Sequence, residues 1–343
     1  MSNIRVLMTG GGAPGAAGII RCLKMDSRIQ LLVGDANPEA VGRYLNEAFI
    51  DLPLASDPDF IDRLLAISID HKIDVLFPLV TRELFKLAGE KERFLQHGIR
   101  IIVSDDESLR IANDKSALVD HLKKHHILVP EFKIVHSLEE LEQAAIELGY
   151  PQKNVVVKPS VSNGSRGVRV LSEQIDEYDL LMNYKPSNLY SSLSKIKSTF
   201  EGKPFPEFLV SEYLPGDEFT IDTLVFQGEP YCIVPRRRLK MVEGISTKGR
   251  FEKNETIIEY ARAIISSMNL SGPIGIQVKQ AEDGQFKVLE INPRIQGTSV
   301  SALGAGINLP LNAVLQEFYQ TIPPLDEPKW GVSFTRYYME VFH

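Results

Sequence analysis

Residues 1–112 alternate between short apolar runs and segments with helical spacing, and this alternation constrains the fold more than any other feature of the chain. The expected strands are 4–8, 31–34, 75–78 and 99–103, and the expected helices are 16–23 and 60–69. Strands separated by helices pair in parallel, because each crossover has to return to the same end of the sheet. We therefore expect an α/β domain with a parallel sheet over residues 1–112.

The pattern changes after residue 112, and we expect a small α+β lobe over residues 113–207. Its expected elements are helices over 116–126 and 137–148 and a hairpin of strands over 154–158 and 168–171. Ser137 and Glu140 have the spacing of a capping box, which marks the start of the second helix. The segment 183–207 is rich in Ser, Lys and Pro and is expected to be a mobile or partly helical excursion.

Strands dominate the third region, residues 208–343. The expected strands are 208–212, 219–226, 231–235, 275–279 and 286–291, and the expected helix is 255–268. Short successive strands of this kind form antiparallel sheets. The tail after Pro324 is expected to pack back as a final strand.

Composition excludes several classes of function. The chain has 38 basic and 45 acidic side chains and a net charge of −7, so nucleic-acid binding is not expected as its main activity. Cys22 and Cys232 are far apart in the sequence, which indicates neither a disulfide framework nor a zinc site. Because no signal peptide or long apolar run is present, we expect a cytoplasmic protein without membrane contact.

A glycine-rich turn, Gly10–Gly18, lies between the first strand and the first helix. Glycines there permit a positive φ and a close approach of the backbone to a ligand, and the helix N-terminus can receive an anion. One interpretation is dinucleotide phosphate binding, with Asp35 holding a ribose hydroxyl. The other is that the turn serves the fold or another ligand, because its spacing departs from G-x-G-x-x-G.

Lys158 ends an apolar strand and is followed by the polar loop 162–168. The strand fixes the position of one ammonium group, and the loop amides can fold over polyphosphate oxygens, as in a nucleotide clamp. The alternative is a surface lysine beside an ordinary hairpin.

A second strand–turn–strand segment, 209–220, places Glu218 just after its turn. It either presents backbone groups to an adenine and Glu218 to a ribose, or is a plain hairpin with an exposed acid.

The strand 288–291 leads into the most specific polar pattern. Glu290 and Asn292 are two residues apart and so point to the same face of an extended strand. Gln277, on the expected neighbouring strand, can add a third oxygen from the same side. Oxygen ligands beside phosphates suit Mg²⁺ or Mn²⁺, and Arg294 would then point at phosphate.

These four elements, in this order, resemble the ATP-grasp superfamily over nearly the whole chain. The closest resemblance is to one synthetase component of the carbamoyl-phosphate synthase large subunit, whose NPR segment also leads into a run like 298–303. It implies a Rossmann-like pre-ATP-grasp domain over 1–112. A two-lobed ATP-grasp domain would follow, with a lid lobe over 113–207 and a metal-binding lobe over 208–343.

The resemblance also implies a role for each matching residue. ATP would be contacted by Lys115, Lys158, Ser165, Gly167, Ser211, Glu212, Leu214 and Glu218. Mg²⁺ or Mn²⁺ would be held by Gln277, Glu290 and Asn292. Charge on the transferred phosphoryl group would be stabilised by Lys158, Lys115 and Arg294. Arg238 is the third expected catalytic residue, and it or one of Arg236, Arg237 and Lys248 would lie near the phosphates or the acceptor carboxylate. Because Gln277 is neutral where many related ligases have an acid, weaker metal binding is expected.

The implied function is that of an ATP-dependent carboxylate–amine ligase. A carboxylate, bicarbonate or carbamate would become an acyl phosphate, which an amine or ammonia then attacks. No Ser/His/Asp or Cys/His arrangement is found, which agrees with a reaction that needs no protein nucleophile. The chain has room for only one synthetase half, so synthesis of carbamoyl phosphate does not follow from the resemblance.

Two alternatives come from other classes of protein. An ATP-binding sensor or assembly subunit would keep the nucleotide pocket without turnover. An NAD-dependent oxidoreductase would instead use the turn Gly10–Gly18. The expected partners are small-molecule carboxylate and amine substrates, and a homodimer is the default assembly.

Overall fold

The computed structural model describes residues 3–162, 166–183, 189–242 and 244–343. The chain divides into two compact units, each built from segments that are distant in the sequence. Unit 1 comprises Met1–Arg110, Phe219–Gln277 and Ile291–His343, and unit 2 comprises Ile111–Glu218 and Val278–Glu290. The division into three domains at residues 112 and 207 stays a prediction from the sequence.

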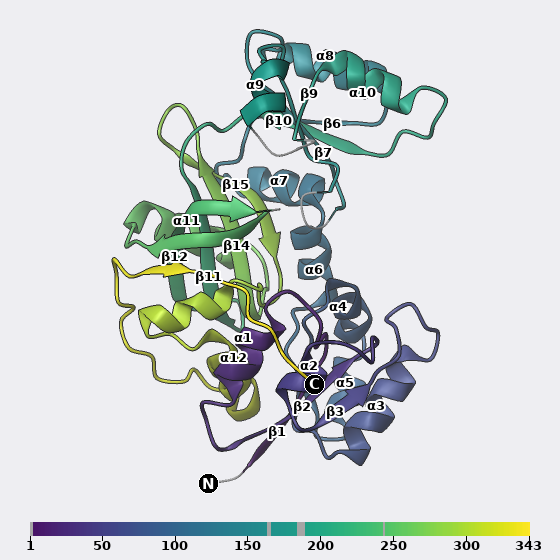
Figure 1. Cartoon of the computed structure of the whole chain (residues 1–343), viewed down its shortest axis with the longest axis vertical. Coiled ribbons are helices and arrows are strands. Elements are labelled where there is room, and N and C mark those ends of the chain that lie inside the picture. Colours follow the sequence, from purple (N-terminus) through teal and green to yellow (C-terminus); the bar gives the residue numbers. More distant parts are fainter. Residues whose placement is uncertain (1–2, 163–165, 184–188, 243) are drawn as a thin grey trace. The chain divides into compact units, whose positions relative to one another are not determined.

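The N-terminal part of unit 1 is the expected parallel α/β domain (Figure 1). Its sheet has the strand order β3-β2-β1-β4-β5, and each adjacent pair is parallel. The strands are β1 (Ile4–Met8), β2 (Ile29–Asp35), β3 (Phe49–Asp51), β4 (Val75–Phe77) and β5 (Arg100–Ile101). The helices of this region are α1 (Ala16–Leu23), α2 (Gly42–Leu45), α3 (Phe60–Asp70), α4 (Thr81–Ala88), α5 (Lys91–Leu95) and α6 (Asp106–Asn113).

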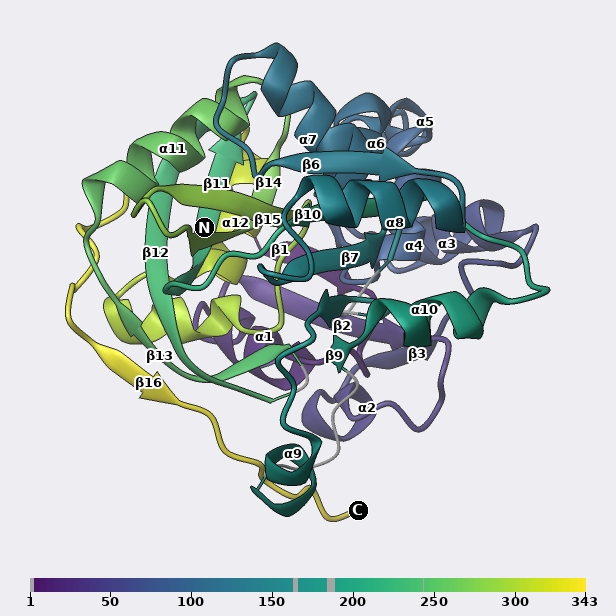
Figure 2. The same cartoon turned by 90° about the horizontal axis from the view of Figure 1, so that it is seen from above.

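A second sheet has the strand order β15-β14-β11-β12-β13-β16, and the pairs β11–β12, β12–β13 and β13–β16 are antiparallel. Its strands are β11 (Glu218–Phe226), β12 (Glu229–Val242), β13 (Ile245–Phe251), β14 (Gly272–Gln280), β15 (Phe286–Asn292) and β16 (Ser333–Thr335). Helices α11 (Glu255–Ser266) and α12 (Leu309–Tyr319) and the 3₁₀-helix η1 (Ser299–Ala305) complete the region. Figure 2 shows β16, in yellow, beside β13, which confirms the predicted final strand. The predicted strand 231–235 was too short, because β12 continues through the basic run that follows it.

One hydrophobic core joins the two sheets of unit 1. It contains Val6 and Val33 from the parallel sheet, Leu224 and Val234 from the antiparallel sheet, and Ala302 from η1, all fully buried. Burial of apolar surface is the main force that holds such layers together. The segment after β15 is therefore packed firmly against the parallel sheet.

Unit 2 is built around a third sheet, with the strand order β6-β10-β7-β8-β9. Its strands are β6 (Phe132–Val135), β7 (Val155–Pro159), β8 (Arg169–Leu171), β9 (Tyr190–Ser191) and β10 (Phe208–Glu212). Its helices are α7 (Lys115–Lys124), α8 (Leu138–Glu147), α9 (Glu177–Asn183) and α10 (Leu193–Phe200). Helices α8 and α10 lie side by side over one face of this sheet (Figures 1 and 2). The predicted hairpin is confirmed as β7–β8, and Ser137 caps α8 by accepting the Glu140 N–H at 3.1 Å.

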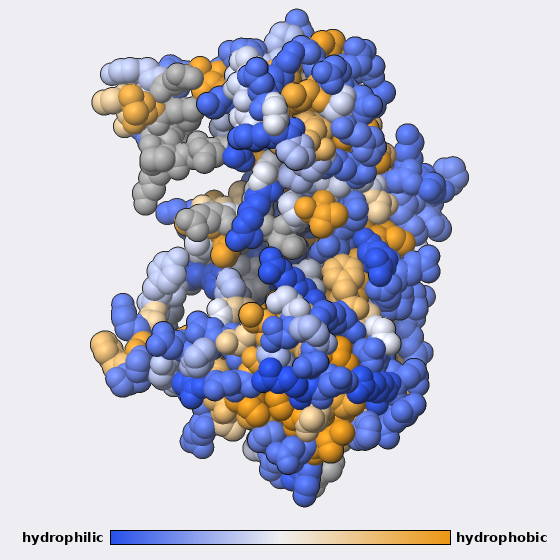
Figure 3. All heavy atoms as spheres, turned by 90° about the vertical axis from the view of Figure 1, so that its right-hand side faces the viewer, coloured by the Kyte–Doolittle hydropathy of each residue, from blue (hydrophilic) through white to orange (hydrophobic). Residues whose placement is uncertain are grey.

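Within the described ranges, no helix is long and apolar enough to cross a membrane. The face in Figure 3 is mainly hydrophilic, and its hydrophobic side chains form small, separate patches. Cys22 and Cys232 are both buried and unoxidised.

Candidate active site

The predicted ATP contact Lys115 is the first residue of α7 in unit 2. Asp114 caps this helix, because its side chain accepts the backbone N–H groups of Ser116 at 2.9 Å and Ala117 at 3.0 Å. The cap fixes where the helix begins, and hence where the lysine side chain leaves the backbone. Lys115 is buried, and its Nζ donates to the carbonyl of Ser162 at 2.9 Å and to its hydroxyl at 3.2 Å.

The second predicted lysine, Lys158, lies near the end of β7, an inner strand of its sheet. Val155 and Val157 belong to the hydrophobic core, so the alternation of a strand turns Lys158 to the opposite face. On that face the Lys158 side chain is only 6% exposed. Its Nζ donates to the carbonyl of Leu289 in β15 at 3.3 Å.

The two lysines lie close enough for their charges to interact. Ser160 links their backbones, because its carbonyl accepts the Lys115 N–H at 2.9 Å. Burial and the charge of Lys115 lower the pKa of Lys158 to about 8, and Glu290 opposes this shift. Burial lowers the pKa of Lys115 as well, again against Glu290. Among the described residues, no carboxylate forms an ion pair with either ammonium. Two adjacent desolvated cations are the electrostatic complement of a polyphosphate.

Glu212, predicted to line an adenine pocket, is the last residue of β10. Its carboxylate forms an ion pair with Lys287 of β15 at 2.5 Å, and the same oxygen accepts the Glu131 N–H at 2.7 Å. The Glu212 N–H donates to the Glu131 carbonyl at 3.0 Å. Glu212 therefore ties β10 to β15 and to the residue before β6. Lys287, which the sequence does not single out, is part of this arrangement.

The other predicted ATP contacts in unit 2 are Ser211, Leu214, Glu218 and Gly167. Ser211 and Leu214 are buried, and Glu218 is the first residue of β11. Gly167 has a φ of +78°, and a Cβ there would lie 2.6 Å from Cγ of Pro159, so this turn accommodates only glycine. The predicted contact Ser165 lies outside the described residues.

In unit 1 a predicted metal ligand and a predicted catalytic residue are in direct contact. Nη1 of Arg238 donates to Oε1 of Gln277 at 3.1 Å. Arg238 also donates through Nε to the Ser246 hydroxyl at 2.9 Å and through Nη2 to the Gly244 carbonyl. These bonds hold the guanidinium of Arg238 in one place beside Gln277.

The predicted metal ligands lie on two neighbouring strands. Glu290 and Asn292 are two residues apart in β15, and β14 beside it carries Gln277. All three side chains offer the oxygen donors that Mg²⁺ and Mn²⁺ prefer, although only one is a carboxylate. In the part of the chain that the structure describes, no three His, Cys, Asp or Glu side chains gather as a metal cluster. The donor set thus fits a cation that is shared with phosphate groups.

Arg294, predicted to contact phosphate, reaches the parallel-sheet domain. Its Nε donates to Oγ1 of Thr81 at 3.0 Å, and its Nη1 donates to the Ile295 carbonyl at 2.9 Å. Thr81 is the first residue of α4. The arginine is therefore held against the first turn of that helix.

A buried ion pair anchors the segment that follows β15. Nε of Arg236 donates to Oδ2 of Asp222 at 2.6 Å, and both side chains are 1% exposed. Nη2 of Arg236 donates to Thr298 at 2.6 Å, and the Ser299 hydroxyl donates to Asp222 at 2.5 Å. Arg236 therefore has a structural role. Arg238, two residues further along β12, differs from it because it contacts the predicted metal ligand Gln277.

A buried acid, Glu83, is absent from the predicted site. It lies in the first turn of α4, is 7% exposed, and accepts a hydrogen bond from the hydroxyl of Thr9, just after β1. Burial raises the pKa of Glu83 to about 7, Thr9 opposes the rise, and Asp35 adds to it. The sequence does not distinguish this acid from the exposed acids of other amphipathic helices.

Neighbouring segments fill the space around the turn Gly10–Gly18. A Cβ at Gly15 would lie 2.4 Å from the Cα of Gly297. Asp35, proposed to hold a ribose, accepts the backbone N–H of Gly12 at 2.8 Å. These contacts favour the interpretation in which the turn serves the fold.

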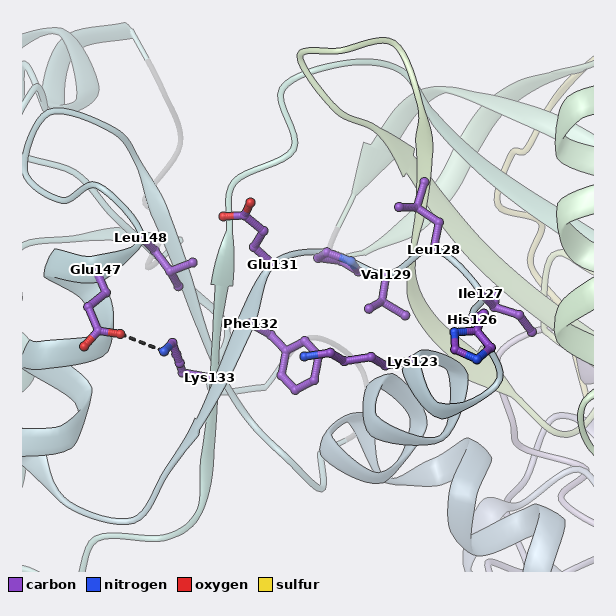
Figure 4. A pocket seen from close by; sticks show the side chains of 11 residues that line it. Lys123, His126, Ile127, Leu128, Val129, Glu131, Phe132, Lys133, Glu147 and Leu148 are labelled. Carbon is purple, nitrogen blue, oxygen red and sulfur yellow. Dashed lines mark ion pairs between the residues drawn. The ribbon is translucent and has the colours of Figure 1, made fainter.

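An open groove of about 610 Å³ in unit 2 is lined by the end of α7, the connection 126–131, β6 and the end of α8. Figure 4 shows Lys123 over the ring of Phe132, at 5.5 Å from its centroid, and Lys133 paired with Glu147 at 2.7 Å. None of the predicted site residues lines this groove. It borders that site at Glu131, whose N–H donates to the carboxylate of Glu212 at 2.7 Å.

Two family models match the chain. Residues 6–102 match the model described as PylC-like, N-terminal domain. Residues 204–335 match the model described as ATP-grasp in the biosynthetic pathway with Ter operon. Lys115 and Lys158 lie between the two matched ranges.

The chain is also similar to proteins of known activity. The carbamoyl phosphate synthase large chain of Archaeoglobus fulgidus is 27% identical over 221 residues, which cover 59% of this chain but only 18% of that protein. The ADP complex of N5-carboxyaminoimidazole ribonucleotide synthetase has a TM-score of 0.72 at 15% identity, covering 97% of this chain and 81% of that one. An L-amino acid ligase from Bacillus licheniformis has a TM-score of 0.65 at 19% identity, covering 93% and 75%. The two structures share the fold, and the matched models show that an ATP-grasp domain over residues 204–335 follows a PylC-like N-terminal domain over residues 6–102.

Proposed function

We propose that this protein is an ATP-dependent carboxylate–amine ligase that works through an acyl phosphate. The observation that carries the proposal is the pair of buried lysines, Lys115 and Lys158, whose pKa values are both lowered. Burying two like charges together is costly unless a polyanion compensates them. The triphosphate of ATP is a ligand of that chemistry. The similar proteins named a synthase, a synthetase and a ligase support the same reaction class.

In this proposal, the predicted residues keep the roles that their chemistry suits. Lys115 and Lys158 bind the phosphates. Ser211, Glu212 and Leu214 line the adenine pocket, Gly167 and the loop around it cover the phosphates, and Glu218 holds the ribose. Gln277, Glu290 and Asn292 would hold Mg²⁺ or Mn²⁺, which neutralises phosphate charge when it is bound.

The reaction consists of two substitutions. A carboxylate oxygen attacks the γ-phosphorus, the bond from this phosphorus to the bridging oxygen breaks, and ADP leaves. The amine nitrogen then attacks the acyl carbon, the bond from carbon to the phosphate oxygen breaks, and phosphate leaves while the surplus proton passes to water. Lys158, Arg238 and Arg294 stabilise the charge on the moving phosphoryl group.

The carboxylate substrate is bicarbonate, carbamate or an organic acid. The relative from Archaeoglobus fulgidus favours the first two, and the L-amino acid ligase favours the third. The activity of the much longer relative cannot be carried over as a whole, because the match spans 18% of its length.

The test is ADP release from Mg·ATP by the purified protein, with pools of bicarbonate, amino acids and other small carboxylates, each with and without ammonium chloride. We expect one pool to stimulate release, Lys158→Met to abolish it, and Lys153→Met to retain it, since Lys153 is an exposed lysine just before the same strand. ATP that raises the melting temperature while no pool stimulates ADP release would instead support the ATP-binding sensor.

A further inference from the structure

The segment 336–343 leaves the six-stranded sheet of unit 1 as an apolar tail. It follows β16, the edge strand of that sheet, and Figure 2 shows it in yellow between β16 and the C-terminus. Its large apolar side chains are between 72% and 94% exposed: Tyr337, Tyr338, Met339 and Phe342. Neighbouring exposed apolar side chains of this size mark an interaction surface.

Both ends of this tail are fixed within unit 1. At its start, the Arg336 N–H donates to the Thr247 carbonyl at 2.8 Å and so continues the pairing of β16 with β13. At its end, the ring of His343 stacks on that of Tyr44 in α2, with the ring centroids 3.8 Å apart. The apolar side chains between these anchors are therefore held in a defined position on the surface.

The residue types of the tail are those of an interface. Tyrosine, phenylalanine, methionine and arginine are enriched where proteins meet, and all four occur in residues 336–343. The three exposed aromatic side chains of one tail would bury about 450–750 Å², at about 150–250 Å² each. A specific interface begins near about 1,200 Å², which two such tails reach together.

Arg336, at the start of the tail, lacks a counter-charge in its own chain. Its guanidinium is half-buried beside that of Arg236, and burial and this neighbouring charge lower the pKa of Arg336, while Tyr338 opposes the shift. Among the described residues, no carboxylate forms an ion pair with it. A carboxylate from a second molecule would therefore be attracted to this position.

The tail itself contains such a carboxylate. Glu340 is exposed and lies four residues after Arg336, so both side chains project from the same face when the tail is extended. Four residues of a strand span about 13 Å, which keeps the two charges of one tail apart. In an antiparallel pair of two tails they meet, because a two-fold axis at Tyr338 places Arg336 of each copy opposite Glu340 of the other.

The backbone of β16 is compatible with this pairing. The Arg336 N–H donates to Thr247, and the Val332 carbonyl accepts the Phe251 N–H at 2.9 Å, so even-numbered residues direct their backbone groups at β13. Because this direction alternates, odd-numbered residues direct theirs at the side of β16 where the described sheet has no further strand. The axis at Tyr338 pairs odd-numbered residues with one another and so joins these outward groups.

We propose that this tail is a homodimer interface, in which the tails of two copies pair as antiparallel strands about a two-fold axis at Tyr338. Arg336 of each copy forms an ion pair with Glu340 of the other. Tyr337 packs against Met339 of the second copy, and the two Tyr338 side chains meet at the axis. The inference does not rest on the proposed ligase activity.

Charge reversal in the full chain tests this arrangement. Sedimentation velocity of the wild type, from micromolar to submillimolar protein, should show a particle of twice the chain mass of 38.4 kDa. Arg336→Glu and Glu340→Arg should each weaken dimerisation by about tenfold or more, because the axis turns one substitution into two repulsive pairs. Arg63→Glu and Glu282→Arg, which make the same charge changes at exposed positions elsewhere, should leave dimerisation unchanged.

Mixing the two single variants gives a result that a merely structural role of these residues would not produce. A heterodimer of Arg336→Glu with Glu340→Arg regains two pairs of opposite charge, so an equimolar mixture should associate although neither variant does so alone. The double variant should dimerise with itself for the same reason. If Arg336→Glu does not fold, Glu340→Arg and Tyr338→Asp, which brings two carboxylates together at the axis, carry the test.

A wild type that stays monomeric over this range would overturn the proposal and leave the tail to a different partner. A dimer that persists in both folded charge-reversal variants would also overturn it, because its interface would then lie elsewhere on the chain. Weakened dimers that neither mixing nor the double variant restores would contradict the pairing of Arg336 with Glu340.

Discussion

Gly15 and Gly297 meet backbone to backbone in unit 1. A Cβ at Gly15 would lie 2.4 Å from the Cα of Gly297, and a Cβ at Gly297 would lie 1.9 Å from the carbonyl oxygen of Pro14. The glycine turn after β1 therefore docks on the segment that follows Arg294. This close approach helps to set where Arg294, a proposed catalytic residue, meets α4.

Gly15→Ala should destabilise the protein by about 2–4 kcal/mol, because it adds a steric clash to an unfavourable left-handed backbone with φ of +105°. Gly98→Ala is the matched control, since Gly98 also has a positive φ, +77°, but no atom within 4 Å of an added Cβ. It should cost about 1 kcal/mol from the backbone alone. Urea unfolding of the two variants measures the difference, and equal midpoints would show that the contact is not tight.

Affinity for Mg·ATP should fall as pH rises above about 8. The pKa of Lys158 is lowered to about 8 in the nucleotide-free protein, and bound phosphates would raise it. The complex then holds more protons than the free protein, so affinity is constant below this pKa and decreases by up to about tenfold per pH unit above it. Calorimetric titrations at pH 7, 8 and 9 would measure this dependence. It should disappear in Lys158→Met, and an unchanged affinity in the wild type would contradict the lowered pKa.

Local sequence patterns predicted most elements of the fold, and they failed where tertiary contacts decide. The run of apolar residues at 4–8 and the helical spacing at 16–23 coincide with β1 and α1. The end of β12 was missed, because three consecutive arginines have the composition of a loop. Arg236 lies in a strand because Asp222, a partner fourteen residues earlier, neutralises it in the interior.

In the candidate site, too, local patterns predicted some residues, and tertiary contacts decide the others. Lys115, Lys158 and Glu290 could be chosen because each stands next to a recognisable strand or cap. Glu83 and Lys287 could not, because burial and ion pairing make them distinctive and neither property is visible in the sequence. Direct contact of Arg238 with Gln277 likewise depends on the pairing of distant strands.

Asp222→Asn should destabilise the protein by about 3–5 kcal/mol, because it leaves the Arg236 guanidinium buried without a counter-charge. Arg236→Met together with Asp222→Leu should recover much of that loss, since neither charge is then buried. Thermal and urea unfolding measure both effects. Asp51→Asn, which breaks an exposed pair with Arg43, serves as the control and should cost less than about 1 kcal/mol. A small effect of Asp222→Asn would mean that water reaches Arg236.

Removing Lys287 should weaken nucleotide binding without changing the nucleotide site directly. The Glu212–Lys287 ion pair, 2.5 Å long with side chains 23% and 10% exposed, joins β10 to β15. In Lys287→Met the carboxylate keeps the Glu131 N–H but loses its counter-charge, and we expect a loss of about 1–3 kcal/mol in stability. Glu212→Gln and the double variant complete a cycle whose coupling energy should be about 1–2 kcal/mol.

The affinity for ATP, measured by calorimetry, should fall in both single variants, because the backbone of Glu212 is proposed to contact the adenine. Lys133→Met on the exposed side of β6 is the control and should leave affinity unchanged. Full affinity in both single variants would separate this ion pair from the nucleotide site.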